Sequence, residues 1–432
     1  MNDHAVYVSV GGLNTRWRVL RAAILLAASL MLVSLLPSSV SAQGSDSPTS
    51  AAAPLKIHEY LMAGDDSRMR ILLHFNGKPE YSWFLLRSPH RLVLDLPETE
   101  FEIDEDSVAG RGLVEDVRYG SMTEDRSRII FSLMGPFSIE DMSVLENGDG
   151  KGYRLVLDLV SASDTEFDKA MLERMDAAAK AAAGSEAATD KAAESAKPAE
   201  EDDRFTIAID PGHGGIDGGA RGASGIDEKM ITLAFGLELK RILEEGDKYR
   251  VVMTRDRDVF LRLDERVRIA REGGADLLIS IHADAIRLKN FRGSTVYTLS
   301  ERASDAEAAA TAARENLSDE LAGLEAEDAR NDVADILADL MRRETHSFSI
   351  QFARTLVGEL KDTVQLVNNP LRSAGFRVLR AHDVPSVLLE LGYLSNAQDE
   401  KLLRDAKWRE KAAKDISRAI DLFATARERA RG

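Results

Sequence analysis

The 432-residue chain contains no cysteine, so it can form neither a disulfide nor a thiolate metal site. Any bound metal ion would therefore be held by histidine and carboxylate side chains. Positively charged residues are also in deficit. The chain has 56 Lys and Arg against 73 Asp and Glu, which gives a formal net charge of −17. This balance argues against nucleic acid as a partner, since phosphate binding needs a basic surface. With 44% hydrophobic residues, a chain of this length can build about two or three domains.

Long apolar runs are missing except for one near the amino terminus, at residues 22–36. Three arginines precede this run, Pro37 ends it, and Val40-Ser41-Ala42 supplies small residues for a cleavage site. This arrangement is typical of a secretory signal peptide, here over residues 1–42. An uncleaved membrane anchor is the alternative, but the run is short for a span of roughly 20 residues. We therefore expect a periplasmic protein that keeps no stable membrane span after cleavage.

Short apolar segments recur over residues 55–160 without long helical stretches between them. Each is about 6–7 residues long, which is the usual length of a strand, and Gly, Pro, Asp or Asn separate them. The clearest segments are 69–75, 91–96, 127–133 and 153–159. The pattern predicts a small all-β, sandwich-like domain.

Residues 161–203 are dominated by Ala, Glu, Lys, Asp and Ser, which predicts a flexible or partly helical linker. From residue 204 to about 425, strand-like and helix-like segments alternate. This alternation predicts an α/β domain with a mostly parallel, twisted sheet flanked by helices. The expected strands are 205–210, 250–255, 277–281, 293–299 and 386–390, and the expected helices are 229–245, 263–272 and 348–361.

The ends of three predicted strands carry residues that could bind a metal ion or take part in catalysis. His213 follows the first strand in a glycine-rich loop, His282 ends the strand at 277–281, and Glu390 ends the last strand. A fourth candidate, Glu228, directly precedes the first helix. Ligands of open α/β sheets bind beyond the carboxyl ends of the strands, so these four side chains are expected on one rim.

Two imidazoles and one carboxylate suit a catalytic zinc ion, which takes three protein ligands and leaves a position for water. Zinc lowers the pKa of that water to roughly 7, and a carboxylate outside the metal shell can then carry the proton. We therefore assign His213, Glu228 and His282 to one Zn²⁺ and Glu390 to acid/base work. Some of these residues also have a purely structural interpretation. Glu228, for example, could be a helix carboxylate favoured by the helix dipole. Such an interpretation is harder for Glu390, because burying an unpaired carboxylate costs free energy.

The pattern IDPGHGG, GIDEK, SIHAD and LLELGYLSN resembles the N-acetylmuramoyl-L-alanine amidases known as amidase 3. All four motifs occur in the family's order over about 204–425. The resemblance implies that His213, Glu228 and His282 hold zinc and that Glu390 is catalytic. It also implies hydrolysis of the amide bond between N-acetylmuramic acid and the first L-alanine of the peptidoglycan stem peptide.

The β domain expected at 55–160 resembles the AMIN domain, on strand pattern and position alone. This likeness implies binding to peptidoglycan and enrichment at the division septum, for septal wall splitting and daughter-cell separation. Two other functions stay open, namely a different zinc hydrolase of the cell wall and a non-catalytic peptidoglycan-binding protein. Histidine and carboxylate ligands can also hold divalent ions other than zinc.

A long insertion with helical composition occupies residues 300–345. Ser304 or Asp305 can cap a first, Ala-rich helix at 306–317, which should be held weakly, and an apolar stripe predicts a second helix at 332–343. Division amidases that resemble this chain plug the zinc site with a Glu from such a helix. Glu315 is the candidate for that role, and Glu307 is the alternative. A helix that only presents a solvated face, without a blocking role, is the other interpretation. The implied activators are LytM-domain proteins of the EnvC or NlpD type.

Overall fold

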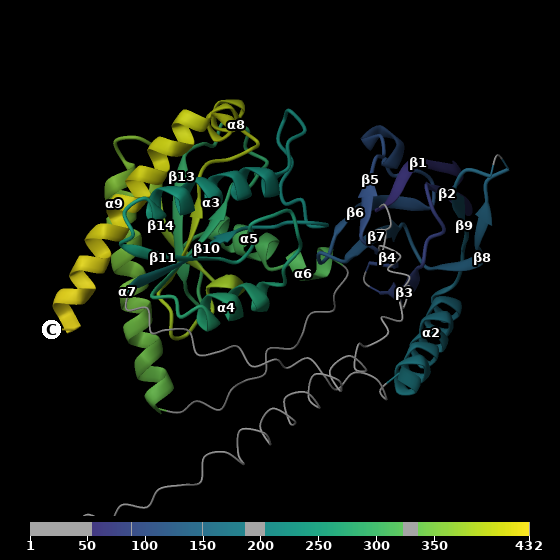
Figure 1. Ribbon diagram of the computed structural model, residues 1–432, viewed down its shortest axis with the longest axis horizontal. Coiled ribbons are helices and arrows are strands. Elements are labelled where there is room, and N and C mark those ends of the chain that lie inside the picture. Colours follow the sequence, from purple (N-terminus) through teal and green to yellow (C-terminus); the bar gives the residue numbers. More distant parts are fainter. Residues whose placement is uncertain (1–53, 88, 149, 186–203, 323–335, 432) are drawn as a thin grey trace, which may run out of the picture. The chain divides into compact units, whose positions relative to one another are not determined.

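The computed structural model describes residues 54–87, 89–148, 150–185, 204–322 and 336–431 (Figure 1). The predicted signal peptide at 1–42 lies outside these residues. Within the described part of the chain, no helix combines the length and the apolar character that crossing a membrane requires.

The first region consists of two sheets built around one apolar core, and all their strand pairs are antiparallel except one at the edge of the larger sheet. The strands alternate between buried and exposed side chains, as β2 does with buried Met69, Ile71, Leu73 and Phe75. This alternation lets one face of each sheet pack inward, and the predicted sandwich-like β region is confirmed. The five-stranded sheet has the order β5-β1-β2-β9-β8 and the four-stranded sheet the order β3-β4-β7-β6. The strands are β1 Leu55–Gly64, β2 Arg68–Phe75, β3 Ser82–Leu86, β4 Arg91–Pro97, β5 Thr99–Phe101, β6 Val114–Ser121, β7 Arg126–Leu133, β8 Phe137–Glu146 and β9 Tyr153–Ser161, with a 3-10 helix at Glu105–Val108.

Helix α2, Asp164–Ser185, follows β9 within the segment predicted as a linker. Its residue Phe167 is fully buried in the core of the β region, where its ring lies 5.3 Å from that of Phe137 and 4.6 Å from that of His90, centroid to centroid. The start of the predicted linker therefore contributes to the β core.

The second region has a six-stranded sheet with the order β11-β10-β12-β15-β13-β14. All neighbours pair in parallel except β13 and β15, so the predicted, mostly parallel α/β sheet is confirmed. Its strands are β10 Phe205–Pro211, β11 Tyr249–Met253, β12 Leu277–His282, β13 Ser294–Leu299, β14 Leu366–Ala374 and β15 Ser386–Glu390. Its helices are α3 Glu228–Glu244, α4 Leu263–Glu272, α5 Ala306–Glu315, α6 Ser318–Leu321, α7 Ile336–Leu360, α8 Ala397–Arg404 and α9 Ala406–Arg431, with a 3-10 turn at Arg377–Leu379.

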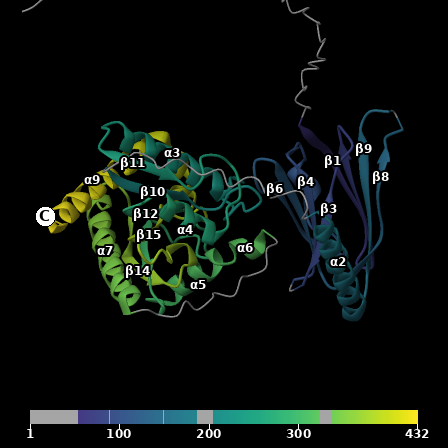
Figure 2. The same cartoon turned by 60° about the horizontal axis from the view of Figure 1, so that its bottom comes forward.

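Helices cover both faces of this sheet (Figure 2). On one face, α3, α7 and α9 bury residues such as Phe235, Phe352 and Ile416 against alternate side chains of β10, β12 and β15. On the other face lie α4 and α5, where Ala308 of α5 packs near Tyr297 of β13. The alternation of strand side chains therefore divides the core into two layers.

Several elements differ from the prediction. Helix α7 is one continuous helix that joins the expected segments 332–343 and 348–361, because no proline and no glycine before Gly358 interrupts it. Residues 332–335 lie outside the described part, as do the side chains of the predicted apolar stripe. Strand β14 was not predicted because Asn368, Asn369 and Pro370 are poor strand formers, and an edge position tolerates the proline. Helices α8 and α9 were also not predicted.

Candidate active site

The sheet register brings three strand ends to one edge. Pro211 at the end of β10 pairs with Ile281 of β12, and His282 at the end of β12 pairs with Glu390 at the end of β15. His213 follows β10 by two residues, and Glu228 is the first residue of α3. His213, His282 and Glu390 therefore start from neighbouring positions at one edge of the sheet, and Glu228 is supplied by the first turn of α3.

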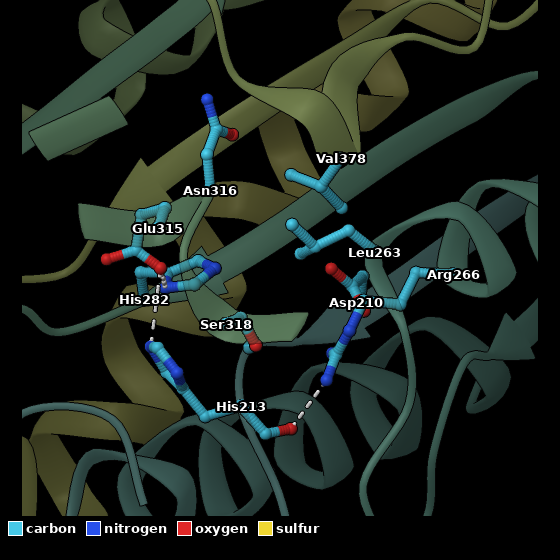
Figure 3. A pocket seen from close by; sticks show the side chains of 10 residues that line it. Asp210, His213, Leu263, Arg266, His282, Glu315, Asn316, Ser318 and Val378 are labelled. Atoms are coloured by element: carbon cyan, nitrogen blue, oxygen red, sulfur yellow. Dashed lines mark hydrogen bonds and ion pairs between the residues drawn. The ribbon is translucent and has the colours of Figure 1, made fainter. Parts of the chain in front are cut away.

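His213, Glu228 and His282 meet in a buried cluster. The Nε2 atom of His213 lies 3.2 Å from Glu228 Oε2, and the Nδ1 atom of His282 lies 3.2 Å from Glu228 Oε1. Glu315, at the end of α5, places its Oε2 atom 3.0 Å from His282 Nδ1 and 3.4 Å from His213 Nε2. Figure 3 shows the side chains of both histidines and Glu315 pointing toward one another.

Hydrogen bonds fix the orientation of these groups. The Nδ1 atom of His213 lies 2.9 Å from Asp217 Oδ2, so its proton can be donated there, while Nε2 has no hydrogen-bond partner. Glu228 accepts the backbone N–H groups of Ala220 at 2.9 Å and Ala283 at 2.7 Å. Asp217 was not predicted, although metal-binding histidines usually donate their second N–H to such a group.

Steric contacts explain why glycine, and no larger residue, occupies two positions of the loop around His213. A Cβ atom on Gly212 would lie 2.4 Å from Cε1 of His282, and one on Gly219 would lie 2.6 Å from Cδ2 of His213. Gly219 has a φ of +68°, and His213 itself has a φ of 60°, which is uncommon for a residue with a side chain. Strained backbone of this kind concentrates at functional sites.

A buried ion pair braces the loop that carries His213. Arg266 of α4 lies 2.9 Å from Asp210 of β10 and also donates to the backbone oxygen of His213 at 2.7 Å (Figure 3). Burial alone would raise the pKa of Asp210, but Arg266 and the hydroxyl groups of Thr254 and Ser280 hold it below its usual value. The loop geometry therefore depends on a fully paired polar network.

Glu390 is fully buried beside the cluster. Its Oε2 atom accepts the backbone N–H of Asp284 at 3.0 Å, and its Oε1 atom has no hydrogen-bond partner. Burial and the nearby charge of Asp284 raise the pKa of Glu390 well above its usual value. A carboxyl group with a raised pKa is suited to take up and release a proton near neutral pH.

The donor set fits a divalent cation. One nitrogen of each histidine and one oxygen of Glu315 lie within 4.8 Å of one another, and Glu228 contacts both rings. Burial lowers the pKa of both histidines, yet the surrounding carboxylates more than offset this and raise that of His282 to about 10. Two imidazoles with buried carboxylates around them are the kind of donor set that holds zinc in proteins.

The other two histidines of the α/β region and the alternative blocking residue lie elsewhere. His346 on α7 is exposed, and His382 precedes β15, at the opposite end of the strand from Glu390. Glu307, the alternative blocking residue, lies 3.7 Å from Arg314 and belongs to the first turn of the helix that Glu315 ends.

Comparisons with known proteins identify the family of each region. Residues 207–421 match the family model described as N-acetylmuramoyl-L-alanine amidase, and residues 61–157 match the AMIN domain. N-acetylmuramoyl-L-alanine amidase AmiA of Escherichia coli K12 is 38% identical over 216 residues, which cover 50% of this chain and 74% of that protein. AmiC of Neisseria meningitidis serogroup B is 31% identical over 362 residues, covering 82% and 86%. AmiC of Escherichia coli O6:H1 is 29% identical over 363 residues, covering 83% and 87%.

Proposed function

The chain belongs to the N-acetylmuramoyl-L-alanine amidase family, and we propose that it hydrolyses the bond between N-acetylmuramic acid and the first L-alanine of the stem peptide in a zinc-dependent reaction. His213, Glu228 and His282 would hold the zinc ion. The convergence of these three buried side chains with Glu390 carries the proposal.

Each residue has a defined task in this reaction. A zinc ion held by the three ligands would supply Lewis acidity, which activates water at neutral pH and polarises the scissile carbonyl group. Asp217 accepts the Nδ1 proton of His213, which leaves Nε2 as the nitrogen available to the metal, and Glu228 is oriented by two backbone N–H groups. Glu390 takes a proton from the attacking water and passes it to the nitrogen of the breaking bond.

We further propose that α5 blocks the site in the resting protein. Glu315 is 6% exposed, and its carboxylate contacts both histidines at the place where a water molecule or substrate oxygen would bind. The N-cap residue Asp305 accepts the backbone N–H of Ala308 at 2.9 Å and so fixes the start of this helix.

The cellular setting follows from the same proposal. A cleaved signal peptide would deliver the protein to the periplasm, and the AMIN domain would direct it to septal peptidoglycan, where it would help daughter cells separate. LytM-domain proteins of the EnvC or NlpD type would activate it by drawing α5 away from Glu228 and the histidines.

Digestion of purified sacculi tests the enzymatic proposal. In the Glu315→Ala background, where the blocking carboxylate is removed, mass spectrometry should find intact stem peptides with a free alanine amine. The further change Glu390→Gln should slow this release by about 100-fold or more and leave the zinc content, measured by metal analysis, unchanged. Retained hydrolysis would contradict the role of Glu390, and cleavage of any other bond would favour a different zinc hydrolase of the cell wall.

A further inference from the structure

Helix α5 carries a cation next to its blocking carboxylate. Arg314 donates from Nη2 to Asp284 Oδ2 at 2.5 Å and to Thr311 Oγ1 at 3.0 Å. Its Nε atom is buried without a hydrogen-bond partner. The arginine therefore reaches Asp284 with one end of its guanidinium group while another donor is left unsatisfied, as expected for a removable contact.

Asp284 lies beside the residue assigned to proton transfer. Oxygen atoms of Asp284, Glu315 and Glu390 lie within 4.8 Å of one another, and the backbone N–H of Asp284 is donated to Glu390. Asp284 is 4% exposed, and Glu390 is fully buried with its Oε1 atom unpartnered. A carboxylate and a proton carrier therefore share one buried space.

Once α5 leaves, Asp284 loses its paired cation Arg314 and can accept another donor. Glu228, Glu315 and Glu390 are its acidic neighbours, and Arg314 is the cation paired with it. A buried carboxylate that loses its partner is strongly destabilised unless another donor replaces it. The amide nitrogen of the substrate must come close to this place, because Glu390 protonates it in the proposed reaction.

We propose that Asp284 is a substrate-binding residue that accepts the N–H of the scissile amide and then the ammonium group of the released stem peptide. This inference rests on the proposed amidase function. Hydrolysis gives the departing nitrogen both protons of the attacking water besides its own hydrogen, while the lactyl carbonyl becomes a carboxylate. The product is therefore a cation at the place of Arg314. In the resting protein, α5 thus fills the site as a substrate would, with Arg314 on the leaving-group side and Glu315 on the metal side.

Binding of the product peptide tests this assignment. Calorimetry would compare a stem peptide that has a free alanine amine with the same peptide N-acetylated, using the full chain carrying Glu315→Ala. The free amine should bind about tenfold more tightly, which is the usual worth of a hydrogen bond between charged groups. The added change Asp284→Asn should abolish this preference, and Asp284→Glu should restore part of it. The matched control Asp256→Asn, in an exposed loop, should leave the preference unchanged.

Kinetics separate a failure of this inference from a failure of the proposed function. If the Glu315→Ala protein does not release stem peptides from sacculi, the amidase proposal itself fails. If it does release them, Asp284→Asn should lower kcat for this release more than it raises KM, with unchanged zinc content. An unchanged kcat, or equal binding of the free and acetylated peptides before and after Asp284→Asn, would overturn the role of Asp284 alone. If the asparagine variant does not fold, the partial retention expected of Asp284→Glu still decides the outcome.

Discussion

At the scale of single residues, the proposed metal site depends on carboxylates that do not themselves bind the metal. Asp217 contacts the ring of His213, and Asp210 holds Arg266 under the loop. These partners determine which nitrogen of His213 is free to bind a cation and where that nitrogen lies. The site is thus preorganised by residues behind its ligands.

Replacing Asp217 with asparagine should weaken zinc binding by about 10- to 100-fold, because an amide can donate as well as accept and so no longer selects the tautomer of the His213 ring as a carboxylate does. Titration with a competing chelator measures this affinity. The same chemical change at exposed Asp256 is the control and should have no effect. An unchanged affinity in Asp217→Asn would show that the ring is held by the backbone alone.

At the scale of elements, α5 is fastened by polar contacts rather than by apolar area. Its buried face offers Ala308 and Ala312, whose methyl groups contribute little hydrophobic free energy. Asn316 compensates for this by donating to the Gly375 carbonyl oxygen at 2.9 Å and accepting the Arg377 N–H at 2.8 Å. An anion such as Glu315 is also unfavourable at a helix carboxyl end. The helix is therefore positioned by directional hydrogen bonds and buries little apolar area, which suits the proposed role as a removable block.

Replacing Glu315 with alanine should raise the basal hydrolysis of sacculi by the purified protein about tenfold or more, because the blocked state loses its contact with the proposed metal ion. Dye release from labelled sacculi measures this rate. Glu307→Ala, on the same helix, is the matched control and should leave the rate unchanged. If Glu307→Ala activates and Glu315→Ala does not, the assignment of the blocking residue is reversed.

At the scale of the whole molecule, the largest apolar core of the β region and that of the α/β region consist of different residues. The proposed zinc ligands all belong to the α/β region. Their ion should therefore stabilise that region, since a ligand that binds only the folded state shifts the unfolding equilibrium.

Removal of zinc with a chelator should lower the unfolding temperature of the α/β region by roughly 10 °C, from about 4 kcal/mol of lost binding free energy at saturating zinc. Calorimetry should show this transition moving while that of the β region stays in place. The variant His282→Ala should show no further shift on chelation. If neither transition moves, zinc binding by the proposed ligands does not stabilise the α/β region.

The sequence alone determined the classes of both regions and the identity of four site candidates. Alternating apolar residues specify strand faces locally, and a histidine or glutamate directly after such a strand must lie at its end, as His282 and Glu390 do. Only the tertiary structure decided that Arg314 pairs with Asp284, that Asp217 supports His213 and that Phe167 enters the β core. The reason is physical. A local pattern encodes the conformation and the buried face of one element, whereas contacts between distant residues depend on how those elements pack.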